Sequence, residues 1–353
     1  MTRSISRWLM AATVAAAAAG AFAQVTPAEG YTPPDDTPAF KVGATIFADY
    51  TKGDRINDAF NVSRAYINVT GNLNHFLAYR ITPDVTRESG TGSSLNGSLT
   101  FRLKYAYGQL NLDDWTTKGS WVRFGIQQTP YLDYTESIYR YRWQGTLFPE
   151  REGYITSSDA GLSGKWNFPN GYGEVHGGFY NGEGYSRAEV NDEKGFQIRG
   201  TLRPFPLGGV WKGLRVTGFA IEDSVQEDAK RERLIGQVTF EHPRGNAGVE
   251  LLSTKDQATP ASVTVEGSGF AVWATPKLFN PNWELLLRHD ETKPVKGTDQ
   301  KRKRDIAGIA YWVPSLQKVT AAVMLDYDSL RQSGFTPARP RDTRYGLKMF
   351  INF

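Results

Sequence analysis

The chain has 353 residues, a formal net charge of +4 at pH 7 and no cysteine. This small net charge does not indicate a nucleic-acid-binding protein, and the lack of cysteine excludes stabilisation by disulfide bonds. The mean hydropathy of −0.45 is that of a soluble protein, but a membrane barrel also has a low mean because its interior side chains are polar. The periodicity of the side chains separates these two classes.

The first segment, Met1–Ala23, has the pattern of a cleavable export signal. Two arginines precede the apolar run Trp8–Gly20, and the small residues Ala21 and Ala23 precede the expected cleavage site. The apolar run is shorter than the roughly 20 residues that a membrane-spanning helix needs. We therefore expect residues 1–23 to be a signal peptide. Residues 24–39 are rich in proline and acidic residues, which predicts a flexible lead-in.

From Phe40 onward, sixteen segments alternate between apolar and polar residues, with turn-forming residues between them. Side chains of a strand point alternately to opposite faces, so each segment can present one face to lipid and one to water. In the last segment Tyr345, Leu347, Met349, Ile351 and Phe353 share one face. The pattern predicts an all-β, transmembrane antiparallel barrel over residues 40–353. Because the alternation is ambiguous in some segments, including Leu99–Leu112, 14 or 18 strands are alternatives to 16.

The lengths of the connections support this fold. Those after even-numbered segments are short, for example Asn74–His75 and Phe168–Gly171, whereas most of those after odd-numbered segments are longer, for example Thr51–Ser63. Outer-membrane barrels have short periplasmic turns and longer extracellular loops. The parity therefore predicts an even number of strands, with both ends of the barrel on the periplasmic side.

Most tryptophans lie beside the connections assigned to the periplasmic side, and Trp143 is an exception. Indole rings favour a membrane interface, whereas the core of a soluble protein would show no bias toward one end. We expect an aromatic girdle at the periplasmic rim, formed by Trp115, Trp121, Trp166, Trp211, Trp273, Trp283 and Trp312.

Charged residues fall on the polar faces of the segments. A charge at the bilayer midplane costs about 2 to 4 kcal/mol, so these residues belong in a hydrated lumen, which sixteen strands leave wide enough for water. The chain is therefore expected to conduct small solutes. The basic residues expected to line the pore are Arg64, Arg80, Arg123, Lys165 and Arg199.

The longest connection, Thr129–Ser158, is the third extracellular loop, and it is too aromatic to be a simple solvated tip. We expect it to fold inward as a constriction, with aromatic side chains ordering the loop and charged side chains meeting the solute. Plugging of the barrel and packing at a subunit interface are alternatives. The residues expected to form this constriction are Tyr131, Asp133, Glu136, Tyr139, Arg140, Tyr141, Arg142, Trp143 and Arg151.

The segment RFGIQQTPYLDYTE at residues 123–136 resembles the phosphate-selective porin O and P family, in which a Gly-Gln-x-x-Pro strand end leads into the constriction loop. The segments at residues 60–84 and 103–112 are similar to early strands of that family. The resemblance implies a sixteen-stranded barrel, usually trimeric, that passes anions. The dense basic ladder of the family is not matched here position by position, and acidic residues lie among the lumen bases.

From these observations we expect an outer-membrane porin for passive diffusion of small hydrophilic solutes, with a modest preference for anions such as phosphate. Its expected partners are outer-membrane lipid, lipopolysaccharide, the barrel assembly machinery and two further copies in a homotrimer. An outer-membrane adhesin, scaffold or enzyme without conductance is one alternative, and a soluble exported all-β binding protein is another. The four histidines are scattered and no nucleophile motif occurs, so no catalytic residue, metal or cofactor is expected.

Overall fold

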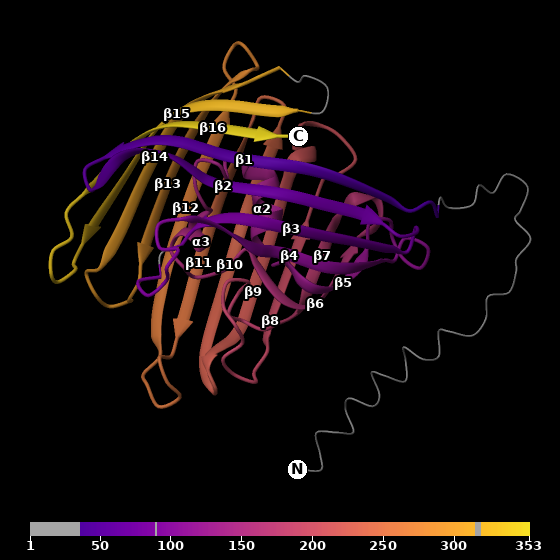
Figure 1. The fold of residues 1–353 in the computed structure, drawn as a ribbon, viewed down its shortest axis with the longest axis horizontal. Coiled ribbons are helices and arrows are strands. Elements are labelled where there is room, and N and C mark those ends of the chain that lie inside the picture. Colours follow the sequence, from indigo (N-terminus) through magenta and orange to yellow (C-terminus); the bar gives the residue numbers. More distant parts are fainter. Residues whose placement is uncertain (1–35, 89, 315–318) are drawn as a thin grey trace, which may run out of the picture. The chain divides into compact units, whose positions relative to one another are not determined.

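The computed structural model describes residues 36–353 except 89 and 315–318; the expected signal peptide and residues 24–35 of the lead-in lie outside the described residues. In this described part, sixteen antiparallel strands form one sheet in which sequence neighbours pair and β1 also pairs with β16. Figure 1 shows these first and last strands side by side. The prediction of an all-β antiparallel barrel with 16 strands is thus confirmed, against 14 or 18.

The first eight strands are β1 (Ala39–Gly53), β2 (Ile56–Asn72), β3 (Leu77–Arg87), β4 (Leu99–Asn111), β5 (Trp121–Gln128), β6 (Ser158–Asn167), β7 (Gly173–Tyr180) and β8 (Gly195–Leu202). The second eight are β9 (Leu214–Gln226), β10 (Ala229–His242), β11 (Gly245–Asp256), β12 (Val265–Pro276), β13 (Trp283–Lys293), β14 (Lys301–Trp312), β15 (Thr320–Ser333) and β16 (Asp342–Asn352).

The helices are short. α2 (Leu132–Tyr139) and α3 (Phe148–Arg151) lie in the third extracellular loop, and the 3-10 turns η2 (Pro169–Gly171) and η3 (Val210–Gly213) lie in connections between strands. Among the described residues, no helix combines the length and the apolar character needed to cross a membrane.

The barrel closes through backbone pairing between β1 and β16. The register runs from Thr45 opposite Asn352 to Gly53 opposite Arg344, and the Thr45 hydroxyl donates to Asn352 Oδ1 at 2.7 Å. Phe353 extends the ladder, since its N–H donates to the Ala44 carbonyl at 3.0 Å. A closed sheet has no edge strand whose backbone N–H and C=O groups are unpaired. This arrangement differs from the open sheets of a soluble sandwich.

The two faces of the barrel differ in polarity. On β15 and β16 the outward side chains Leu325, Tyr345 and Leu347 are exposed, whereas the inward Asp326 and Met324 are buried. Apolar residues on the outer surface and polar residues on the inner one are typical of a barrel whose exterior contacts lipid.

A bulge in β4 changes the face of its residues. The pairing of β3 with β4 shifts between Thr82 and Pro83, which pair with Tyr105 and Leu103, so Lys104 is the additional residue. A bulge re-aims side chains locally. Lys104 and Tyr105 are therefore both buried on the inner side, and the alternation in this segment is interrupted.

Some predicted loops are instead extensions of strands. The predicted loop Thr51–Ser63 is mostly strand, because β1 ends at Gly53 and β2 begins at Ile56. Lys52–Asp58 is mostly polar, which gives it the composition of a loop, but the exposed Phe60 and Val62 continue the apolar outer face of β2 two positions apart.

Candidate constriction site

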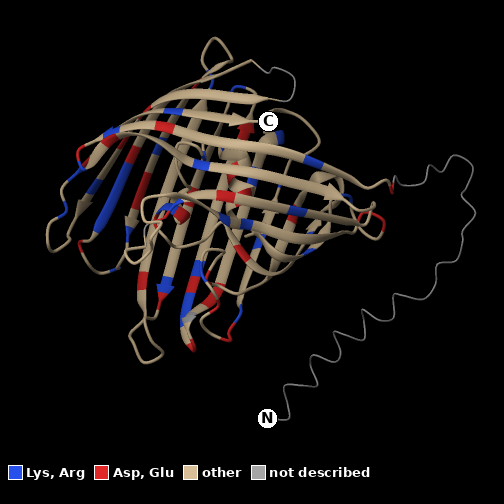
Figure 2. Cartoon of the chain, in the orientation of Figure 1, with Lys and Arg blue, Asp and Glu red and all other residues tan. Residues whose placement is uncertain are grey.

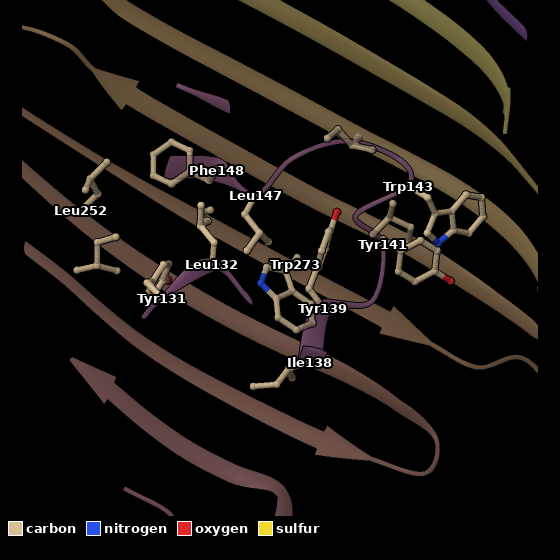
Figure 3. Close-up of a cluster of buried hydrophobic side chains, with 14 of the residues drawn as sticks. Tyr131, Leu132, Ile138, Tyr139, Tyr141, Trp143, Leu147, Phe148, Leu252 and Trp273 are labelled. Carbon is tan, nitrogen blue, oxygen red and sulfur yellow. The ribbon is translucent and has the colours of Figure 1, made fainter. Parts of the chain in front are cut away.

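The third extracellular loop, between β5 and β6, folds into the barrel, as predicted. Tyr131, Tyr139 and Tyr141 are fully buried, and α2 carries a buried face that includes Leu132 and Ile138. Figure 3 shows these side chains directed toward the strands of the barrel wall. Arg140 caps the C-terminus of α2 with a φ of 64°, and its N–H donates to the Glu136 carbonyl at 2.8 Å.

Aromatic rings attach the loop to one side of the barrel. Tyr131 stacks on Phe219 of β9 at 5.1 Å between ring centroids, and Tyr139 meets Trp273 of β12 edge to face at 5.1 Å. Trp143 stacks on Phe350 of β16 at 6.0 Å. Aromatic pairs at such separations add about 0.5 to 1.5 kcal/mol beyond the area they bury.

Polar contacts fix the same segment. An Arg140 guanidinium nitrogen lies 3.0 Å from the Glu284 carboxylate on β13, and Gln144 donates to Asp326 on β15 at 3.0 Å. Asn246 of β11 donates to the Ile138 carbonyl at 2.7 Å. The loop is thus held against the wall formed by β9 to β16.

On its other side the loop faces strands β1 to β4 across a small cavity. The cavity has a volume of about 250 Å³ and is lined by Arg80 and Lys104 of the wall and by Asp133, Glu136 and Arg142 of the loop, among others. Acidic groups of the loop therefore lie opposite basic groups of the barrel wall.

The three predicted arginines of the loop are ion-paired. Arg140 pairs with Glu284, Arg142 lies 2.8 Å from Glu136, and Arg151 lies 4.0 Å from Asp328. Their positive charges are therefore compensated by neighbouring carboxylates. Burial raises the pKa of the Glu136 carboxyl to about 7, although the Arg142 guanidinium acts in the opposite direction.

Four basic residues of the barrel wall, unlike the arginines of the loop, lack an acidic partner in the described chain. Arg80, Lys104, Arg123 and Lys165, which we call the basic wall, have no carboxylate within 4.0 Å among the residues that the structure describes. They come from four consecutive strands, β3 to β6. Figure 2 shows the basic and acidic positions interspersed on the strands of the barrel.

The other two bases predicted to line the pore have acidic partners. Arg64 lies 2.7 Å from Asp84. Arg199 is buried beneath the loop, pairs with Glu174 and donates from Nε to the Pro130 carbonyl at 2.6 Å. The prediction that Arg199 faces the pore is therefore wrong, because the start of the third loop covers it.

Sequence reasoning missed Lys104. The alternation of apolar and polar residues is broken in the segment that contains Lys104, and this break could have indicated a change of face. The structure shows that a bulge causes it, because the bulge turns Lys104 and Tyr105 to the same side.

The predicted girdle of tryptophans is wrong at three positions. Trp121, Trp273 and Trp312 point into the barrel: Trp121 and Trp273 are buried opposite Lys165 and Arg288, and Trp312 packs on the loop. The prediction considered only the position of each tryptophan along the barrel axis, and did not consider whether its side chain points into the barrel or toward lipid. The side chains of Trp115, Trp166, Trp211 and Trp283 are exposed, and their role as a girdle stays a prediction.

Several solved structures share this fold. They include an anion-selective porin from Comamonas acidovorans, with 13% sequence identity, 90% of this chain and 100% of that chain covered, and a TM-score of 0.63. OmpT of Vibrio cholerae, an outer-membrane protein, has 12% identity, coverage of 90% and 98%, and a TM-score of 0.62. OmpF of Salmonella typhi has 12% identity, coverage of 89% and 97%, and a TM-score of 0.62. At these identities the similarity establishes the fold, which is that of outer-membrane porins.

No family model matches the chain, and no curated protein matches it.

Proposed function

We propose that the protein is an outer-membrane porin that allows passive diffusion of small hydrophilic solutes, with a modest preference for anions such as phosphate. The closed barrel, its apolar outer face and its polar interior support a location in the outer membrane. The loop that narrows the lumen supports a size-limited pore rather than an open one.

The basic wall is the observation that carries the anion preference. Its four cationic side chains have no carboxylate within 4.0 Å in the described part of the chain, whereas the loop arginines and Arg64 are paired. Uncompensated positive charge attracts anions and repels cations in a narrow aqueous pore. Asp133 and Glu136 on the loop oppose this field, which limits the preference to a modest one.

Further parts of the proposal rest on similarity. The resemblance of residues 123–136 to the phosphate-selective porin O and P family favours phosphate among the permeant anions and a homotrimer as the assembly. OmpT of Vibrio cholerae, which shares the fold, has been solved in a trimer form. Lipopolysaccharide and the barrel assembly machinery are proposed as partners, and the signal at residues 1–23 as the route of export.

Reversal potentials in a planar bilayer test this function. Purified protein is placed in a KCl gradient, and we expect a reversal potential whose sign indicates chloride preference, with measurable current from potassium phosphate. A preference for potassium would contradict the anion preference. Absence of any current would favour the adhesin, scaffold or enzyme alternatives.

A further inference from the structure

Each cation of the basic wall lies against aromatic rings. The Arg80 guanidinium carbon is 4.4 Å from the centroid of Tyr105. Lys104 Nζ is 4.8 Å from the centroid of Tyr66 and 5.5 Å from that of Tyr105. A cation within about 6 Å of a ring centroid is attracted by the negative face of the ring. These four residues form one cationic and aromatic group.

The neighbouring strands repeat the arrangement. The Arg123 guanidinium carbon is 4.6 Å from the centroid of Tyr107 and 3.8 Å from that of Trp121. Lys165 Nζ is 5.8 Å from the same Trp121 ring. The basic wall is therefore a surface in which cations and aromatic rings are interleaved over strands β2 to β6.

Part of each arginine is available to a solute. Arg80 donates to Asn68 from Nη2 at 2.8 Å and to Thr82 from Nε at 2.9 Å. Arg123 donates to Gln109 and Gln128 at 2.7 and 3.0 Å. In each arginine, one terminal amino group makes no hydrogen bond to a described residue. The hydrogen bonds of the other two nitrogens hold the guanidinium in place. A fixed guanidinium with a free donor suits a carboxylate.

The rings distinguish between classes of anion. Chloride and phosphate interact with charge and hydrogen-bond donors, and gain nothing from an aromatic surface. The cavity between the wall and the loop is also lined by Phe47, Trp143 and Phe350. An anion with a flat apolar body can bury that body against these rings while its charge meets the cations.

The size of the cavity limits the solute. Its volume of about 250 Å³ is below the roughly 300 to 1,000 Å³ of sites that hold drug-sized ligands. A molecule with a single ring is therefore the appropriate class.

We propose that the constriction binds single-ring aromatic carboxylates with higher affinity than it binds inorganic or aliphatic anions. This inference rests on the proposed function, because it assigns a solute class to the same pore.

Block of chloride current tests the inference. The full chain is reconstituted in a planar bilayer in KCl, and benzoate, cyclohexanecarboxylate, acetate or phosphate is added to one side. We expect half-maximal block by benzoate at a concentration about fivefold or more below that of each other anion. Equal block by benzoate and acetate, with chloride current present, would overturn the inference alone. Absence of chloride current would overturn the proposed function as well.

Variants separate the rings from the charges. Tyr66→Leu and Tyr105→Leu each remove a ring that lines the cavity and keep every cation, so we expect the benzoate advantage to fall by about twofold or more while the reversal potential in KCl stays unchanged. Phe124→Leu, on the outer face of β5, is the matched control and should leave both quantities unchanged. The use of two variants keeps the test valid if one fails to insert. Retention of the full benzoate advantage in a conducting Tyr variant would overturn the assignment to these rings.

Discussion

A single guanidinium nitrogen of Arg140 lies 3.0 Å from both carboxylate oxygens of Glu284, and this contact joins the end of α2 to β13 across the barrel interior. Glu284 is fully buried, whereas about a third of the Arg140 side chain is exposed. The pair therefore holds the loop in the lumen, and its loss leaves a buried carboxylate without its cation.

Arg140→Gln should loosen the third loop. Removing one partner of a buried charged hydrogen bond costs about 1 to 3 kcal/mol. We expect a larger and noisier KCl conductance in single-channel recordings, together with a lower unfolding temperature. Lys303→Gln is the control, because Lys303 pairs with Glu291 at 3.0 Å on the more exposed outer side, where such pairs contribute about 0 to 1 kcal/mol. A quiet channel of unchanged conductance would show that the aromatic contacts alone hold the loop.

Neutralising part of the basic wall should weaken the anion preference. In the double variant Arg123→Gln, Lys165→Gln, two cations without an acidic partner in the described chain are lost, so the reversal potential in a KCl gradient should move toward that of potassium. The shift should shrink at high salt, since the Debye length falls from about 8 Å at 0.15 M to about 3 Å at 1 M. Lys303→Gln serves again as the control. An unchanged reversal potential at low salt would indicate that these cations do not set selectivity.

The barrel could be predicted from the sequence because its signal is repeated in every strand. Alternation of faces and parity of loop lengths depend on local residues, and together they predicted sixteen strands in a closed barrel, which the structure confirms. The inward third loop was predicted separately, from the aromatic residues of Thr129–Ser158, and is also confirmed. The loop prediction Thr51–Ser63 was too long, because the polar residues near the turn hid the strand ladder that reaches Gly53 and starts again at Ile56.

The composition of the site could be predicted only in part, because pairing between distant residues decides which charges are free. Arg199 and Arg80 look alike in sequence, yet Arg199 pairs with Glu174 beneath the loop and Arg80 has no carboxylate within 4.0 Å in the described chain. Lys104 enters the lumen only because of a bulge defined by its partner strand. Trp273 turns inward to meet Tyr139, a residue 134 positions away, and no local pattern indicates such a contact.

Acidification should increase the anion preference. Burial raises the pKa of Glu136 to about 7, so this carboxyl is charged above that pH and becomes neutral below it. Lowering the pH from about 8 to about 6 then removes a negative charge from the cavity that it shares with Lys104 and Arg80. Reversal potentials in a KCl gradient should move toward that of chloride over this interval. Glu136→Gln should show the low-pH selectivity throughout; a pH response of normal size in that variant would assign the titration to another group.

A glycine within β5 should be required for the barrel to form. Gly125 has a φ of 123°, and a Cβ atom there would lie 2.3 Å from the Ala106 carbonyl oxygen of β4. Gly125→Ala therefore forces the backbone of two paired strands apart, in addition to about 1 to 3 kcal/mol of conformational strain. We expect a lower yield of folded barrel and a lower temperature of unfolding on gels run with and without heating. Gly108→Ala is the matched control on β4, because an added Cβ meets no atom within 4 Å there. Equal stability of the two variants would mean that β4 and β5 move apart at Gly125 without loss of stability. The close approach of these strands would then not be needed to position the loop that follows.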